Sequence, residues 1–178
     1  NNHPSVAVWL LQETQPGLVG PFRDWLHWAG RHEYDSSPWV PDERLEGFRE
    51  TLRGLIEPMR GVARVVGLSG RGKSRLTLEA LGPTVAEELS RIRLCDLVLY
   101  AVEQEAGAET IKGVVQNLVD ARIRAIIVVD RCPQESHRDL AAMVKRSDSR
   151  LSLVTIDHEI PRGDVLPGDT ILVEAAPV

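Results

Sequence analysis

The sequence is poor in cysteine, in net basic charge and in long apolar runs, and each shortage excludes a class of protein. Cys95 and Cys132 are too few for a disulfide framework or a cysteine zinc site, so we expect a reducing, cytoplasmic location. The net charge of −5 gives no sign of the basic face that is typical of nucleic-acid binding. No apolar run approaches the ~18 residues of a membrane span, so we expect no membrane association.

The ends of the chain suggest a fragment of a longer multidomain protein. It begins with Asn1 rather than Met and closes on an apolar stretch with no helix after it. Residues 1–38 are expected to form an aromatic-rich linker or capping segment, with a short amphipathic helix around 22–29. The side chains expected to pack from this helix are Phe22, Trp25, Leu26 and Trp28.

Residues 39–178 alternate between helix and strand patterns. Helical patterns span 41–60 (ending at Pro58), 73–91, 108–121 and 134–146. Apolar runs of strand length lie at 63–67, 96–102, 124–130, 151–157 and 170–176. Continuous Val, Ile and Leu strands separated by helices indicate a sheet covered on both faces. The prediction is an α/β fold of three layers around a mostly parallel five-stranded sheet.

Residues 67–74, GLSGRGKS, connect the first strand of this domain to the helix after it. They match the pattern G-x-x-x-x-G-K-[ST], in which backbone N–H groups and the helix N-terminus cradle phosphates. The pattern predicts that Lys73 reaches the β- and γ-phosphates and that Ser74 ligates Mg²⁺. A glycine-rich turn with an exposed lysine is the alternative, but the flanking strand and helix favour a phosphate-binding loop (P-loop). The residues expected to contact the nucleotide are Gly67, Leu68, Ser69, Gly70, Arg71, Gly72, Lys73, Ser74 and Arg75.

Asp130 closes the apolar strand RAIIVVD. A P-loop needs an acidic residue at the end of a neighbouring buried strand to hold Mg²⁺ through water, and Asp130 matches this Walker B pattern. Such an aspartate is otherwise often only a cap for the next helix. Together with the P-loop, the pattern favours the metal-binding role.

The nucleotide is expected to be ATP (or ADP), and its hydrolysis slow. The Asn-Lys-x-Asp motif by which signalling GTPases read guanine does not occur. Arg131 follows Asp130 where a water-orienting carboxylate is usual, and a protonated arginine cannot act as a base. Glu103 and Glu105 are candidates to substitute, and Glu135 is a weaker one. The first two are otherwise solvated loop carboxylates.

Other polar residues near the strand ends carry less specific signals. Thr155 and Asp157 end the fourth strand, where a residue that senses the γ-phosphate would lie, although polar residues are common at strand ends. His137 and His158 lack metal-ligand spacing and are expected at the surface or at a helix start.

The order of these motifs resembles the NTPase module of STAND proteins, which are related to the NACHT and apoptotic ATPases. The resemblance covers about 39–178 and rests on the segments 41–56, 65–81, 98–106, 125–134 and 150–159. It implies an ATP-controlled switch that self-associates and works with other domains of its chain, in regulation or in defence against phage. Lys73 and Ser74 would bind phosphate and Mg²⁺, and Asp130 would hold Mg²⁺ through water. Arg131 departs from the family pattern, as does the lack of a sensor arginine near 155–157.

Two alternatives to a switch remain at this stage. A conventional catalytic P-loop ATPase or small-molecule kinase would need an arginine finger or an arginine-rich lid, and the segment 161–164 is too short for such a lid. The second alternative is a nucleotide-binding scaffold that does not hydrolyse ATP. The intact set Lys73, Ser74 and Asp130 argues that nucleotide binding itself is retained.

Overall fold

A computed structural model describes residues 21–31, 43–68, 72–87, 93–163 and 165–174. Their helices, strands and 3₁₀ turns (η) occur in the order α2 (Trp25–Arg31), α3 (Glu43–Ile56), β1 (Val62–Val66), α4 (Lys73–Leu81), η1 (Val85–Glu87), η2 (Leu94–Leu97), β2 (Val98–Val102), α5 (Glu103–Ala106), α6 (Ala108–Asp120), β3 (Ile126–Asp130), α7 (Gln134–Val144), β4 (Ser152–Asp157) and β5 (Thr170–Leu172).

The five strands form one sheet in the order β2-β3-β4-β1-β5. All four strand pairs are parallel, with registers such as Val65 opposite Ile156 and Val102 opposite Asp130. Strands β1 to β4 are buried along their whole length, as expected for a sheet covered on both faces. The predicted three-layer α/β fold is confirmed.

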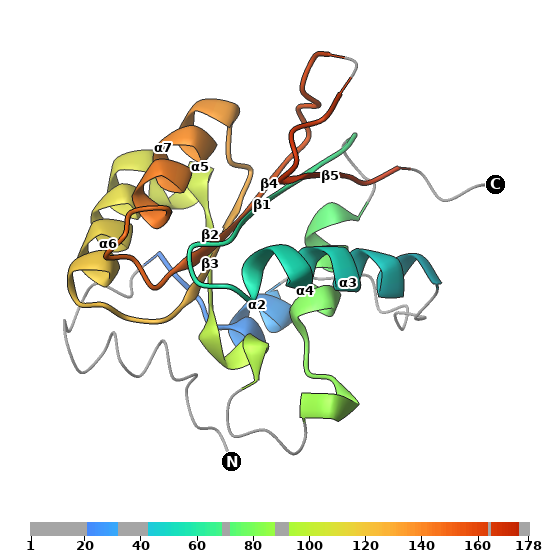
Figure 1. Ribbon diagram of the computed structural model, residues 1–178, viewed down its shortest axis with the longest axis horizontal. Coiled ribbons are helices and arrows are strands. Elements are labelled where there is room, and N and C mark those ends of the chain that lie inside the picture. Colours follow the sequence, from blue (N-terminus) through green and yellow to red (C-terminus); the bar gives the residue numbers. More distant parts are fainter. Residues whose placement is uncertain (1–20, 32–42, 69–71, 88–92, 164, 175–178) are drawn as a thin grey trace.

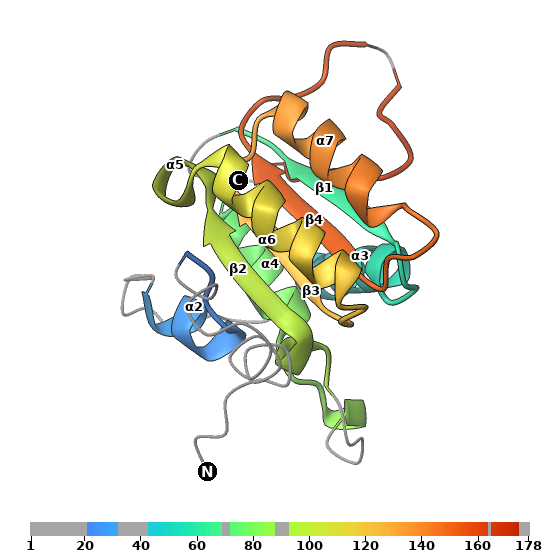
Figure 2. The ribbon, with the colours of Figure 1, turned by 90° about the vertical axis from the view of Figure 1, so that its left-hand side faces the viewer.

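Helices cover both faces of this sheet and divide the core in two (Figure 1). Helices α6 and α7 pack on one face through side chains such as Leu118 and Leu140, which meet Ile127 and Leu153 of the sheet. Helices α2, α3 and α4 pack on the other face, where Leu52 and Leu76 lie in one cluster with Val65 and Val128. Figure 2 shows the α6 and α7 layer in front of the strands.

Helix α2 packs on the sheet and on α4. Phe22 and Trp28 are buried, and the Trp25 indole N–H donates to the Leu78 carbonyl of α4 at 2.9 Å. Leu26, however, is 63% exposed, so its predicted packing is wrong; it projects from the helix face opposite to Trp28. The expected boundary at residue 38 lies outside the described residues.

Two predicted elements are shorter in the structure because turns interrupt them. The helix expected over 73–91 ends at Leu81, where the Gly82 N–H bonds back to the Glu79 carbonyl and Pro83 follows. The strand expected over 96–102 begins at Val98, because Leu94–Leu97 forms a 3₁₀ turn closed by Arg93 and Asp96. Strand β5 spans Thr170–Leu172, and the end of its predicted range lies beyond the described residues.

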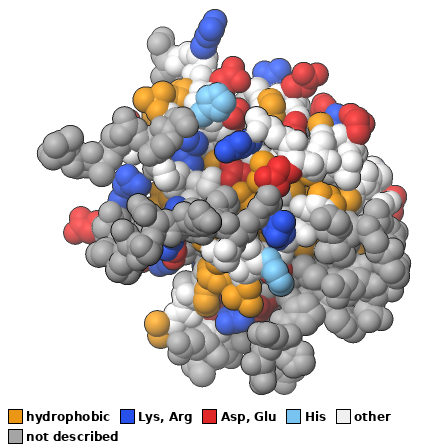
Figure 3. Space-filling view, turned by 180° about the vertical axis from the view of Figure 1, so that it is seen from behind, with side chains coloured by type: hydrophobic (Ala, Val, Ile, Leu, Met, Phe, Trp, Pro, Cys, Tyr) orange, Lys and Arg blue, Asp and Glu red, His pale blue; other side chains and the backbone are white. Residues whose placement is uncertain are grey.

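The described surface is mixed in character. Figure 3 shows acidic, basic and hydrophobic side chains interspersed on the face behind the view of Figure 1. Within the described ranges, no helix combines the length and apolarity that crossing a bilayer demands.

Candidate functional site

The candidate site lies where the parallel strands end. Because all five strands run in one direction, their carboxyl ends meet at the same edge of the sheet, the edge at which open α/β folds bind ligands. Strand β1 leads there into the segment 67–72, β3 ends at Asp130 and β4 ends at Asp157. The residues predicted from three distant sequence motifs therefore converge.

At two positions of the segment between β1 and α4, the backbone geometry favours glycine over other residues. A Cβ on Gly67 would lie 2.5 Å from the Val173 carbonyl oxygen, so only glycine fits beside the chain that leaves β5. Gly72 has φ 73° and ψ 23°, a left-handed conformation, and directly precedes the first residue of α4. Both glycines of the predicted pattern thus have a geometric reason. Ser69, Gly70 and Arg71 lie outside the described residues.

Lys73 and Ser74 form the first turn of α4 and reach different partners. The Lys73 ammonium donates to the Leu68 carbonyl at 2.9 Å, back across the loop. The Ser74 hydroxyl donates to Oδ2 of Asp130 at 2.6 Å, which joins the helix to the end of β3. Arg75 pairs through Nε with Glu79, one turn further along α4.

Asp130 is held by donors from three elements. Its Oδ2 accepts from Ser74 and, at 2.8 Å, from the hydroxyl of Tyr100 on β2. Its Oδ1 accepts from the Arg131 backbone N–H at 2.9 Å. The side chain is 7% exposed, so these bonds offset the cost of burying a carboxylate. Asp130, at the end of β3, is therefore a fixed acceptor for the Ser74 hydroxyl in the first turn of α4.

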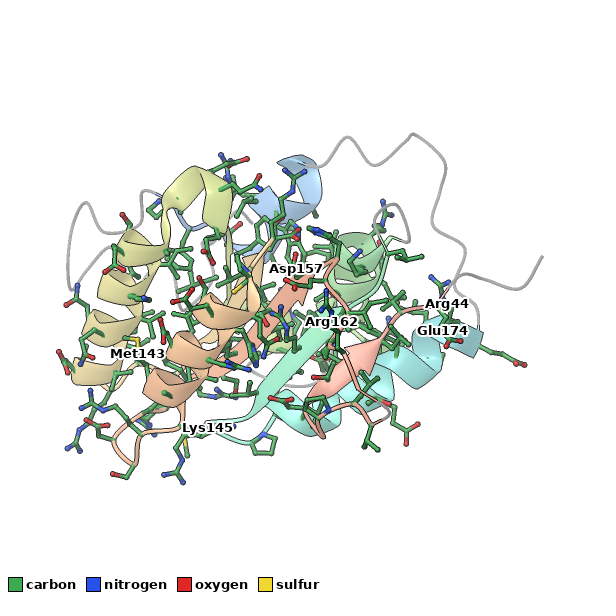
Figure 4. The ribbon with its side chains drawn as sticks, turned by 90° about the horizontal axis from the view of Figure 1, so that it is seen from above. Arg44, Met143, Lys145, Asp157, Arg162 and Glu174 are labelled. Carbon is green, nitrogen blue, oxygen red and sulfur yellow. The ribbon has the colours of Figure 1, made fainter. Side chains whose placement is uncertain are left out.

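Lys73 is buried near two carboxylates. Its side chain is buried, and this burial lowers the pKa of the ammonium, whereas the carboxylates of Asp130 and Asp157 act in the opposite direction. The carboxylates of Asp130 and Asp157 thus act electrostatically on the Lys73 ammonium at this edge of the sheet. In Figure 4, Asp157 lies between the α6 and α7 layer and the α3 and α4 layer.

A second buried polar cluster lies below α7. Arg64, in the middle of β1, is 1% exposed; its guanidinium donates to the Thr155 hydroxyl and to the Cys132 carbonyl, and lies 3.5 Å from Asp157. His137 of α7 shares the Thr155 hydroxyl through Nδ1 at 2.7 Å. The sequence predicts His137 at the surface or at a helix start; it lies in the first turn of α7 but is 5% exposed, because α7 presents this face to the sheet. His158, in contrast, is exposed as predicted.

The carboxylates considered as water-orienting groups lie apart from Asp130. Glu103 begins α5, and its Oε1 accepts from Ser136 of α7 at 2.7 Å, on the face of the sheet opposite to α4. Glu105 and Glu135 are exposed. Arg131 has φ 52° and directs its guanidinium to the Gln104 side chain at 3.0 Å.

Sequence reasoning missed two residues at this edge. Arg64 interrupts the apolar strand ARVVG, and a charge in a buried strand was a usable signal that it has a buried partner. Tyr100 is the only residue of DLVLYAV after Asp96 with a polar side chain, but its link to Asp130 depends on the pairing of β2 with β3. A guanidinium from β1 thus lies beside Thr155 and Asp157 at the end of β4.

The donor set suits a hard cation rather than a soft one. Within the described ranges, no cluster of three or more His, Cys, Asp and Glu side chains has the geometry of a metal site. Burial raises the pKa of Cys95 to about 11 and that of Cys132 as well, so both thiols stay protonated. Mg²⁺, however, uses one or two protein oxygens with phosphate and water as its other ligands, and the Ser74 hydroxyl and Asp130 carboxylate fit that demand.

No protein-family model matches the sequence, and no curated protein is significantly similar to it.

Proposed function

We propose that this chain is the ATP-binding, slowly hydrolysing switch module of a STAND-like signalling or anti-phage defence protein, located in the cytoplasm. The observation that carries the proposal is the convergence of Lys73, Ser74 and Asp130 at the carboxyl edge of a parallel sheet. The resemblance in motif order supports the STAND assignment.

The sheet order supports the branch of P-loop ATPases in which a strand is inserted between the loop strand and the Walker B strand. Strand β4 lies between β1 and β3, so one strand separates the loop strand from the strand that carries Asp130. In chain order the segment LVLYAV stands between the two motifs, but in the sheet it forms the edge strand β2. The inserted strand is therefore β4.

Different residues of the chain would bind the phosphates and the Mg²⁺ of the nucleotide. The backbone N–H groups at the start of α4 and the Lys73 ammonium would hold the β- and γ-phosphates, for which Lys73 gives up its bond to the Leu68 carbonyl. The Ser74 hydroxyl would ligate Mg²⁺, and Asp130 would accept from its water. When bound, Mg²⁺ neutralises phosphate charge.

Slow turnover is proposed because Arg131, and not a carboxylate, directly follows Asp130. Arg131 cannot take a proton from water, and Oε1 of Glu103 accepts from Ser136 of α7, on the face of the sheet opposite to α4. The site would then alternate between nucleotide-bound states rather than hydrolyse ATP rapidly. The bound state would control self-association and the neighbouring domains of the chain.

The test is a titration of the chain with ATP in the presence of Mg²⁺, compared with Lys73→Ala. Loss of the ammonium should weaken binding about 10- to 100-fold, because hydrogen bonds to charged groups contribute about 1.5–3 kcal/mol. The control is Lys145→Ala, which removes an exposed lysine at the far end of α7 and should leave binding unchanged (Figure 4).

A single-turnover assay separates a switch from a conventional enzyme. Turnover below about 1 per second supports the switch, since typical enzymes exceed that rate. Equal binding by the wild type and Lys73→Ala would overturn the site, and fast turnover would overturn the switch in favour of a catalytic ATPase.

A further inference from the structure

The hydroxyl of Tyr100 is part of the contact shell of Asp130. An ionised carboxylate has about four acceptor positions, and here three are occupied, by Ser74, Tyr100 and the Arg131 N–H. The hydroxyls of Tyr100, on the edge strand β2, and of Ser74, on helix α4, both donate to Oδ2 of Asp130. The Tyr100 bond is buried, so water does not compete for it.

The Tyr100 ring is itself held from the N-terminal segment. Its face stacks on the Trp28 indole with ring centroids 4.3 Å apart and planes 7° apart, and both side chains are fully buried. Its backbone N–H and carbonyl each bond to Arg23, at 2.7 and 2.8 Å. Because the backbone of Tyr100 and the face of its ring are both held, the position of its hydroxyl beside Asp130 is fixed.

We infer that Tyr100 is a positioning residue for Asp130, and that α2, through Trp28, sets the orientation of the carboxylate that the proposed function assigns to Mg²⁺. This role rests on that proposed function. Ser74 can donate its hydroxyl proton to Asp130 and still offer lone pairs to a cation. That dual use requires Oδ2 to stay in place, and the Tyr100 bond holds it there independently of α4.

The variant that tests the role is Tyr100→Phe, which keeps the ring and its stack on Trp28 and removes only the hydroxyl. ATP affinity is measured twice, with Mg²⁺ and with excess chelator. We expect binding in Mg²⁺ to weaken about 10-fold, the lower end of the effect of disturbing the outer-shell groups of a metal site. Binding in chelator should be unchanged, because Lys73 and the loop do not depend on Tyr100.

A control distinguishes positioning from general destabilisation. Ser152→Ala removes a buried hydroxyl at the opposite end of the sheet, where it donates to the Ile56 carbonyl at 2.6 Å. This variant should lose thermal stability but keep the wild-type ratio of the two affinities. If Tyr100 were merely structural, Tyr100→Phe would behave in the same way, and the positioning role would be overturned.

The contribution of α2 has its own test. Trp28→Leu removes the stack, which is worth about 0.5–1.5 kcal/mol, and should weaken Mg²⁺-dependent binding about threefold in the wild type. In the Tyr100→Phe background it should have no further effect, since Trp28 acts through the hydroxyl. An equal loss in both backgrounds would overturn the link from α2 to Asp130.

Failure of the proposed function gives a different result. A wild type that does not bind ATP overturns the switch and this role together. A wild type that binds ATP, paired with a Tyr100→Phe variant that keeps its full Mg²⁺ dependence, overturns the role of Tyr100 alone. A thermal-unfolding cycle of Tyr100→Phe with Asp130→Asn measures the bond without nucleotide, and zero coupling also overturns the role.

Discussion

Arg64 is a buried cation whose partners come from other strands and loops. Its guanidinium binds Thr155, which lies 91 residues away, and the Cys132 carbonyl, which lies 68 residues away. These contacts arise because Arg64 stands opposite Thr155 in the β1–β4 register. The sequence shows that a charge interrupts an apolar strand, but not which strand pairs beside it, so the partner was out of reach of sequence reasoning.

His137 makes the stability of this cluster sensitive to acid. Burial lowers the pKa of its imidazole from the ordinary value, the Arg64 guanidinium lowers it further, and Asp169 opposes both. The unfolded chain therefore binds a proton more readily than the folded protein. The free energy of unfolding should fall as pH drops below about 6.5, by at most about 1.4 kcal/mol per pH unit from this group.

The comparison of wild type with His137→Asn measures that contribution. Urea unfolding at pH 7.5 and pH 5.5 should show a larger loss on acidification in the wild type than in the variant, whatever their absolute stabilities. His158→Asn, at an exposed histidine, should keep the wild-type difference. An unchanged pH dependence in His137→Asn would mean that other groups control the acid sensitivity.

At the scale of elements, α3 holds the carboxyl end of α4. Arg53 of α3 donates to the carbonyls of Ala80 and Gly82 and pairs with Glu87, while Arg49 donates to the Glu79 carbonyl. These guanidiniums satisfy carbonyls that the end of a helix leaves without partners. The helix that carries Lys73 and Ser74 is thus fixed at its far end by its neighbour.

Arg53→Met should reduce the free energy of unfolding by about 2–3 kcal/mol. The variant keeps most of the aliphatic stem but leaves partly buried carbonyls and Glu87 without their charged donor. Chemical denaturation measures the loss, and Arg138→Met, at an exposed position of α7, should change stability by less than about 0.5 kcal/mol. A negligible loss in Arg53→Met would show that packing alone holds α4 in place.

The ends of elements were harder to predict than their existence. The expected helix over 73–91 runs past Gly82 and Pro83, which are local stop signals; Arg53 and the Trp25 ring also occupy the space there, and a Cβ on Gly82 would lie 3.1 Å from that ring. Arg53 and Trp25 both belong to segments that precede the P-loop strand. Helical periodicity is a local signal and does not register such distant contacts.

For the whole molecule, the alternation of apolar strands and helices was enough to predict the α/β class and the three layers. The placing of Lys73, Ser74 and Asp130 at one edge followed from the parallel direction of the strands. The position of β4 between β1 and β3 did not, because strand order depends on the crossovers between elements. The link from Tyr100 to Asp130 depends on strand order and register together, and so was missed.

The bridge between Arg23 and Tyr100 has a consequence for solubility. Strand β2 is an edge strand, buried throughout, and Arg23 pairs the outward N–H and carbonyl at its centre while α2 covers its flank. Without that cover the strand would offer unpaired backbone groups and apolar side chains to a second chain, the usual start of aggregation. A chain beginning at residue 32 should therefore scatter more light at equal concentration than one beginning at residue 21. Equal scattering would mean that another part of the chain covers the edge of β2. Stronger scattering by the shorter chain would mean that residues 21–31 prevent copies of the chain from associating through this strand.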